Sequence, residues 1–530
     1  MSATNYENYE GARQVNQPKQ SQLKGCFLLQ RSFAPVGHAM AYVFQKKYRV
    51  MEHCALVGVR KNYEFLLSQT DVKYTDLLLD EDIHPLYKDE IVDLNYLGWL
   101  EKEYGIPNLW PYLTVDRILM HGQFLRLYPY DQPLFNQENL LKILQITAKK
   151  IITFLEKEKP DFIFFAAVGS LAPLLLYEIA KKKSIPIFSG EFSRFKNQYT
   201  VTDDLREFSL LRRQFLKIRS REIIPAPEEI ERAKSWLQSF GEKPDAYDQT
   251  TASGPDTTKK QRRAKLSLPA KLYWSGRSFI KALAGYLANK QKNDYLQLNP
   301  WFYILDRLKR KVRVLIGYND LYDKIEDNED FVYFPLSFEP ELSLLFCAPF
   351  ATDQVHVVKQ LARALPINYK LCVKEHPHMA GDRTRKFYRE IKKMPNVKLI
   401  RPNVSGFELI KKAKLVATIS GTSGWEALLL KKPVITFGAT SYNLLSMVKY
   451  CTSMNDLAAM VKERLENFHF NDEEMLDFII ALRRYTIPVD MLKLWGHREG
   501  QTDLKHLSQE IEPLVDLMAE KLNLKAKITD

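Results

Sequence analysis

Polar residues with the chemistry to bind a phosphate follow two apolar, strand-like runs, 369–373 and 414–417. The first run ends in a basic loop and the second in a turn rich in hydroxyl groups: Lys374-Glu375-His376-Pro377 and Ser420-Gly421-Thr422-Ser423. A strand that ends in small residues and opens a helix presents unpaired backbone N–H groups and the positive end of the helix dipole. Neighbouring parallel strands end at one crevice. We therefore predict a nucleotide-phosphate site shared by the two loops.

The loop after residue 373 supplies three different functions to such a site. Lys374 brings a positive charge, and His376 can donate a hydrogen bond to a phosphoryl oxygen or leaving group near neutral pH. Pro377 stiffens the backbone just after the strand end. One His-Pro pair alone is weak support, so the prediction depends on its pairing with the Ser/Thr turn.

Two carboxylates follow a third strand-like run, 331–336. Glu339 and Glu341 can act as acid, base or ribose ligand if they point inward, and they are ordinary loop carboxylates if they face solvent. The sequence does not decide between these alternatives.

The N-terminal half contains a weaker version of the same pattern. Gly169-Ser170 lies between a strand-like run and a helix-like run, and Glu191 and Arg194 follow the next strand-like run. These residues suit an acceptor pocket, but Gly-Ser turns are also common connections without any ligand.

The chain has no metal or dinucleotide signature. It has no H-x-x-x-H or Cys/His set, and neither a Walker P-loop nor a G-x-G-x-x-G fingerprint. The one Asp-x-Asp sequence, Asp80-Glu81-Asp82, has no matching phosphate turn and is interpreted as a charged loop. We expect no metal and no cofactor.

Short apolar runs alternate with helix-like stretches in two long parts of the chain, which predicts an α/β protein with two Rossmann-like lobes facing a cleft. The second alternation includes an expected strand at Val312–Ile316. We expect five parts: a disordered N-terminus at 1–23, an acceptor lobe at 24–239, a basic linker or insertion at 240–311, a nucleotide-sugar lobe at 312–452 and a helical region at 453–530.

The net charge of +13 is concentrated in one segment, since residues 259–313 contain fifteen Lys and Arg against two Asp. Within it, 271–290 fits an amphipathic helix, which can lie on an anionic membrane or serve as a solvated linker helix. Localised charge without a recognised motif argues against nucleic-acid binding. No signal peptide is evident, and the apolar stretch 162–177 is short and interrupted by Gly, Ser and Pro. The expected location is the cytoplasm, with contact to the inner membrane face through 259–313.

The region from Tyr333 to Gly438 resembles the bacterial capsule polysaccharide synthesis family of glycosyltransferases. The matching stretches are 333–336, 339–341, 373–377, 418–426 and 432–438. Residues 103–110 and Asp116-Arg117 also resemble a pattern found in surface-glycan proteins.

The resemblance implies a GT-B fold and transfer of a sugar such as Kdo from a CMP-linked donor. The pairing of His-Pro with a Ser/Thr turn is also similar to sialyltransferases and to teichoic-acid glycerophosphotransferases. By this resemblance His376, Ser420, Thr422 and Ser423 hold the donor, with Glu426 as a candidate for the ribose or base.

We therefore predict a metal-independent glycosyltransferase that uses a nucleotide-sugar donor and a glycan or glycolipid acceptor. Three alternatives stay open: a CDP-polyol phosphotransferase, a nucleotide-sugar epimerase or hydrolase of the same fold, and a non-catalytic glycan-assembly scaffold. The sequence leaves retaining or inverting chemistry undecided.

Overall fold

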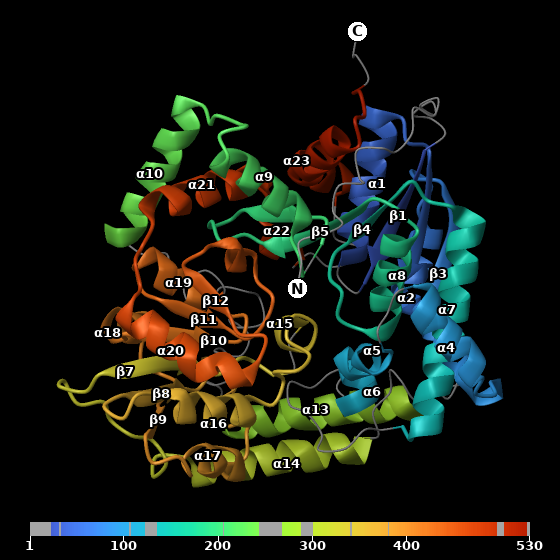
Figure 1. The fold of residues 1–530 in the computed structure, drawn as a ribbon. Helices are drawn as coiled ribbons and strands as arrows, with labels where there is room; N and C mark the ends of the chain where they lie inside the picture. The colour runs from blue at the N-terminus through green and yellow to red at the C-terminus, as the bar shows by residue number, and fades with distance from the viewer. Residues whose placement is uncertain are drawn as a thin grey trace.

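Two β-sheets, each flanked by helices, organise the molecule (Figure 1). The computed structural model describes residues 23–526 except for these positions: 31–32, 105–107, 122–134, 205, 243–267, 288–299, 340–341, 380 and 496–502. The predicted α/β class with two Rossmann-like lobes and a C-terminal helical region is confirmed.

The first sheet has the order β13-β6-β5-β4-β1-β2-β3. Its strands are parallel except where β6 pairs with β5 and β13. Their bounds are β1 (Lys24–Leu29), β2 (Glu52–Val57), β3 (Tyr74–Leu79), β4 (Phe162–Phe165), β5 (Ile187–Phe192), β6 (Tyr199–Thr202) and β13 (Thr486–Ile487). The helices of this lobe are α1 (Ala34–Tyr48), α2 (Arg60–Leu67), α3 (Asp80–Ile83), η3 (His84–Asp89), α4 (Leu94–Glu103), α5 (Trp110–Val115), α6 (Arg117–His121), α7 (Gln137–Glu158) and α8 (Leu171–Lys182). The next two helices, α9 (Ser209–Arg219) and α10 (Pro227–Glu242), pack against the core of the second lobe.

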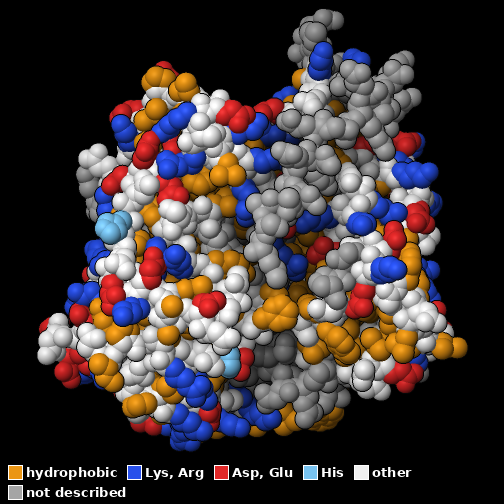
Figure 2. All heavy atoms as spheres, in the orientation of Figure 1, with side chains coloured by type: hydrophobic (Ala, Val, Ile, Leu, Met, Phe, Trp, Pro, Cys, Tyr) orange, Lys and Arg blue, Asp and Glu red, His pale blue; other side chains and the backbone are white. Residues whose placement is uncertain are grey.

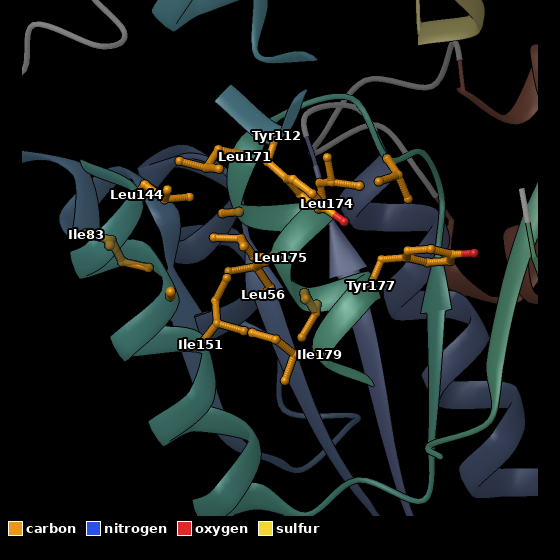
Figure 3. Close-up of a cluster of buried hydrophobic side chains, with 14 of the residues drawn as sticks. Leu56, Ile83, Tyr112, Leu144, Ile151, Leu171, Leu174, Leu175, Tyr177 and Ile179 are labelled. Carbon is orange, nitrogen blue, oxygen red and sulfur yellow. The ribbon is translucent and has the colours of Figure 1, made fainter. Parts of the chain in front are cut away.

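Aliphatic side chains from α7 and α8 cover one face of this sheet (Figure 3). Leu144 and Ile151 on α7 lie opposite Leu175 on α8, and all three are buried. The 3.6-residue spacing of apolar positions on both helices produces this packing, because it gathers them on the side that faces the sheet. The core therefore holds α7 and α8 against this face of the sheet.

The second sheet is parallel throughout and has the order β12-β11-β10-β7-β8-β9. Its strands are β7 (Phe331–Pro335), β8 (Lys370–Lys374), β9 (Val397–Ile400), β10 (Leu415–Thr418), β11 (Val434–Thr436) and β12 (Val448–Tyr450). The helices are α15 (Leu342–Leu345), α16 (Gln354–Ala364), η4 (Pro377–Met379), α17 (Arg385–Ile391), α18 (Gly406–Lys412), α19 (Thr422–Leu429), η5 (Ser441–Leu444), η6 (Met454–Asp456) and α20 (Leu457–Glu466).

The chain after the second sheet returns to the first lobe. It forms α21 (Asp472–Arg483), α22 (Met491–Trp495) and α23 (Leu504–Lys521), and β13 joins the edge of the first sheet. α23 packs on α1, where the Lys47 ammonium lies 2.6 Å from Glu512 and 2.8 Å from Asp516. The C-terminal helical region thus links the two lobes.

Aromatic side chains also join the lobes directly. The Phe346 ring, from the segment after α15, lies edge-on to Tyr177 of α8, with centroids 6.2 Å apart. The Arg206 guanidinium stacks on the same Phe346 ring, 4.2 Å from its centroid. Trp236 of α10 stacks against Trp425 of α19 at 6.3 Å. Trp236 thus packs against the core of the second lobe, next to the helix that follows the Ser/Thr turn.

The expected strand at Val312–Ile316 is wrong, because these residues end a helix, α14 (Pro300–Ile316). Apolar positions recur at three- and four-residue intervals from Trp301 onward, and the short run of branched residues at its end resembled a strand only in isolation. α14 lies beside α13 (Leu268–Leu287), and in Figure 1 the pair lies along the lower edge of the molecule. The expected amphipathic helix at 271–290 overlaps α13.

Within the described part of the chain, every helix is too short or too polar to cross a membrane. The apolar stretch 162–177 instead divides into β4, a turn and the first half of α8.

Candidate functional site

The loops predicted to bind phosphate meet at the carboxyl edge of the second sheet. β7 pairs with both β10 and β8, so the three strands are adjacent. Val416 is in register with Tyr333, and Pro335 with Lys374, which brings the three strand ends to one level. Neighbouring strands lie about 4.8 Å apart, so the ends of β8 and β10, on either side of β7, are about 10 Å apart. β7 lies between β8 and β10, so these two strands are not direct neighbours, but their loops leave the same edge of the sheet.

The Ser/Thr turn leads directly into α19. Gly421 is the N-cap residue and has no side chain of its own to cap the helix. The Thr418 hydroxyl accepts a hydrogen bond from the Gly421 N–H at 3.2 Å, and the Tyr442 hydroxyl donates to the Gly421 carbonyl. These bonds fix the turn at Gly421 while the helix begins at Thr422 and Ser423, whose hydroxyls are partly accessible. The helix start is thus held in a form suited to an anion.

The His376 loop follows β8. Lys374 is buried, His376 is half-buried and Pro377 is exposed at the start of η4. The Phe338 ring lies edge-on to the His376 imidazole, with centroids 5.7 Å apart. Phe338 belongs to the loop after β7, so the two loops contact each other through these rings.

A buried arginine, which the sequence gave no reason to select, joins the same two loops. The Arg383 side chain is fully buried and forms ion pairs with Glu375 and Glu339. It also donates to the Ser337 carbonyl at 2.6 Å, and Tyr388 donates to the second oxygen of Glu375. The two carboxylates keep the pKa of Arg383 above its ordinary value despite burial, while burial and then Glu375 raise that of Tyr388. Glu375 in turn accepts the His376 N–H, so the network positions the histidine.

The structure describes only one of the two predicted catalytic carboxylates, Glu339. Glu339 pairs with Arg383 at 3.2 Å and accepts a hydrogen bond from Gln354 of α16. Gln354 also accepts from the Ser337 N–H at 2.7 Å. These contacts give Glu339 a role in holding the β7 loop. Glu341 lies outside the described residues.

Arg194, predicted for the acceptor pocket, lies beside the donor turn. Its guanidinium is 6.0 Å from the centroid of the Tyr442 ring, and Tyr442 bonds to Gly421. The first lobe therefore contributes a positive charge near the start of α19. Glu191 is in β5, but its side chain is outside the described part. Glu426 is on α19, one turn after the helix start, and is half-buried.

A carboxylate of the protein itself binds the helix start at the Gly169-Ser170 turn. The fully buried Asp116 accepts a hydrogen bond from the Leu171 N–H, at the first residue of α8, at 2.9 Å. Its other oxygen accepts from the N–H groups of Ile118 and Leu119 at 2.9 Å and 3.1 Å. A carboxylate thus already neutralises the start of α8. This geometry does not favour a second anion at Ser170.

Asp80 is another carboxylate at this edge of the first sheet, and its pKa is raised. Burial, followed by the charges of Asp116 and Glu81, raises the pKa of Asp80 to about 7. Asp80 begins α3 directly after β3. The carboxyl edge of the first sheet therefore brings two carboxylates together, whereas at the second edge Glu339 and Glu375 are paired with Arg383.

Comparison with known proteins agrees with the sequence resemblance. Residues 270–463 match the model of a family described as capsule polysaccharide biosynthesis protein. The predicted resemblance is confirmed for this part of the chain. The match includes α13, α14, the His376 loop and the Ser/Thr turn, so the candidate site lies within it.

A curated relative and several solved structures are also similar. Protein FixF of Sinorhizobium fredii is 31% identical over 136 residues, which is 25% of this chain and 33% of that protein. The chain thus matches about a third of the relative's length. The Thermosulfurimonas dismutans KpsC beta Kdo 2,7 transferase aligns with a TM-score of 0.34 and 11% identity, over 70% of this chain and 90% of that one. The UDP-GlcNAc 2-epimerase of Neisseria meningitidis aligns with a TM-score of 0.21 and 11% identity, over 94% and 100%.

Proposed function

We propose that the protein is a metal-independent glycosyltransferase of GT-B type that transfers a sugar from a nucleotide-sugar donor to a growing capsule or surface polysaccharide. The observation that supports it most is the meeting of the His376 loop and the uncapped start of α19 at one sheet edge. The match of residues 270–463 to capsule polysaccharide biosynthesis proteins supports a role in the synthesis of such a polysaccharide. The sequence resemblance favours a CMP-linked donor of Kdo or sialic-acid type.

In this proposal the second lobe binds the donor phosphate. The N–H groups and hydroxyls of Thr422 and Ser423 donate hydrogen bonds to the phosphate oxygens at the helix start, with Ser420 and Gly421 shaping the turn. Lys374 and His376 neutralise the charge that develops on the departing phosphate, and Arg194 adds to the field from the first lobe. Glu426 holds the ribose or base. Fixed dipoles of this kind favour the transition state because they need little reorganisation.

Glu339 and Arg383 act through positioning. The pair joins the β7 and β8 loops, and Glu375 holds the His376 backbone. An error of about 1 Å in a reacting group can cost about a hundredfold in rate, so a rigid network under the loop has a direct benefit.

The first lobe presents the acceptor, a glycan or glycolipid hydroxyl. The carboxylates of Asp80 and Asp116 at its edge disfavour a second phosphate there. We assign Gly169, Ser170 and Glu191 to the acceptor side on the sequence pattern. We place the reaction in the cytoplasm, at the inner face of the membrane where a lipid-linked acceptor would lie.

The test is release of nucleotide by purified protein from CMP-Kdo, CMP-sialic acid, UDP-GlcNAc and CDP-glycerol, with and without a capsule-oligosaccharide acceptor. We expect acceptor-dependent release of CMP and a loss of at least about a hundredfold in His376→Ala. Donor consumption without acceptor would instead favour an epimerase or hydrolase. Release from CDP-glycerol alone would favour a polyol phosphotransferase. Unchanged turnover in His376→Ala would contradict the assigned role.

A further inference from the structure

Helix α14 is attached to the second lobe by its charged side. The Arg310 guanidinium is 2.5 Å from the carboxylate of Asp382, which is fully buried, and Arg313 donates to the Asp382 backbone carbonyl at 2.6 Å. Gly381, at φ 83°, allows close approach, since a Cβ there would lie 2.6 Å from Val314. Residues 310 and 313 are on one face of a helix. That face is therefore fixed against the lobe.

The opposite face of α14 is apolar and exposed. With about 100° between successive residues, positions 301, 305, 308, 312 and 315 lie roughly opposite Arg310. They form a stripe of large apolar side chains that are between 45% and 85% exposed: Trp301, Leu305, Leu308, Val312 and Leu315. Amphipathic helices ordinarily turn such a stripe toward the core. A contiguous exposed apolar surface is typical of an interaction site.

Basic side chains flank this stripe. Lys309 and Lys311, both exposed, fall on its two sides by the same helical geometry. The neighbouring α13 adds the exposed residues Tyr273, Arg277, Ile280 and Leu287. On the face shown in Figure 2, hydrophobic and basic side chains are intermixed along the lower edge, where Figure 1 has α14.

We propose that the apolar stripe of α14, with the exposed face of α13, lies on a membrane surface that contains anionic lipids. The leucines would enter the boundary between headgroups and acyl chains, while Lys309 and Lys311 meet lipid phosphates. A second copy of the chain is disfavoured as the occupant. Residues 259–313 contain fifteen Lys and Arg against two Asp, so two such faces would repel each other.

This inference deepens the proposed membrane location but does not depend on the transfer reaction. If it fails, nucleotide release with an oligosaccharide acceptor would be unaffected. If the reaction proposal fails, membrane binding would persist.

The experiment is flotation of the full-length protein with vesicles of phosphatidylcholine alone or mixed with phosphatidylglycerol. We expect binding only to the anionic vesicles. The double variant Leu308→Glu/Leu315→Glu should weaken it at least about tenfold, and Lys309→Gln/Lys311→Gln about tenfold. The matched control is Ile224→Glu, which is 81% exposed in the connection between α9 and α10, at the other end of the molecule (Figure 1), and should bind normally.

Because the substituted side chains are exposed, the circular dichroism melting temperature should change by only a few degrees. The milder lysine variant tests the inference if the glutamate variant fails to fold. The proposal would be overturned if the wild-type protein does not bind anionic vesicles, or if the stripe variants bind them as well as the wild type does. A dimer in analytical ultracentrifugation that the leucine variant dissociates, without vesicle binding, would assign the stripe to self-association instead.

Discussion

The two lobes contain the same local pattern, a buried strand, a small hydroxyl turn and a helix, yet the two helix starts differ. α8 begins under the carboxylate of Asp116, which bonds to the Leu171 N–H at 2.9 Å. α19 begins at a glycine cap without a side-chain acceptor in the described structure. The difference comes from a residue 55 positions away from Leu171 in the chain. A strand–turn–helix pattern therefore identifies a possible anion site, and the tertiary structure decides whether it is already filled.

The surroundings of the turns differ in charge as well. Asp80 and Asp116 bring two carboxylates to the first edge, where burial first and then the charge of Asp116 raise the pKa of Asp80. The second edge has Lys374, and Arg194 approaches it from the other lobe. An anionic nucleotide is thus favoured at the second turn and disfavoured at the first.

The largest expected effect comes from the network that supports the second edge. Arg383→Met leaves Glu375 buried without its cation, so we expect a loss of about 3–5 kcal/mol in the free energy of unfolding. Arg385→Met is the matched control on the same segment. Its partner Asp320 is exposed, and the change should cost less than about 1 kcal/mol. Urea unfolding measures both, and equal losses would contradict the role of the network.

The second-largest effect is expected from removal of the Asp116 carboxylate at the start of α8. Asp116→Asn places an amide donor where the carboxylate accepts from Leu171 and should destabilise the fold by about 2–3 kcal/mol. Nucleotide affinity of the folded variant should be unchanged. The control is Asp93→Ala, which removes the exposed cap of α4 and should cost about 1 kcal/mol. A variant at position 116 that loses nucleotide binding without losing stability would reverse the assignment of the two turns.

A pH-dependent difference should be the smallest of the three. The pKa of Asp80 is about 7 in the folded protein, raised first by burial, and 3.8 is its ordinary value. The folded state therefore binds more protons, and the stability from this group is present below pH 4 and lost as pH rises through 7. Asp80→Asn should remove this dependence and raise the free energy of unfolding at pH 8 by about 1–3 kcal/mol.

Urea unfolding at pH 5 and pH 8 measures this difference for the wild type and for Asp80→Asn. An identical pH dependence in both proteins would show that Asp80 is ionised in the fold.

The sequence predicted the parts of the fold that depend on local patterns. The alternation of short apolar runs with helix-like stretches predicted both lobes. The error at 312–316 arose because a short apolar run is compatible with a strand and with the end of a helix.

The candidate site shows the same limit. The His376 loop and the Ser/Thr turn were found because their residue types stand at strand ends. Arg383 was not selected, since nothing local in the sequence indicates that its partners are Glu375 and Glu339. Likewise, Arg194 was assigned to the acceptor because it belongs to the first lobe, although it lies next to Tyr442 of the second.

The central claim is that the start of α19, and not that of α8, receives the nucleotide phosphate. The most direct measurement is the shift in melting temperature caused by CMP, CDP, UDP and GDP in the wild type, Ser423→Asp and Ser170→Asp. An aspartate in the first turn of α19 should stabilise the fold by about 0.3–1 kcal/mol through the helix dipole while excluding a phosphate. We predict that CMP stabilises the wild type and Ser170→Asp but not Ser423→Asp. Stabilisation that survives in Ser423→Asp and is lost in Ser170→Asp would contradict the claim, as would a wild type that no nucleotide stabilises.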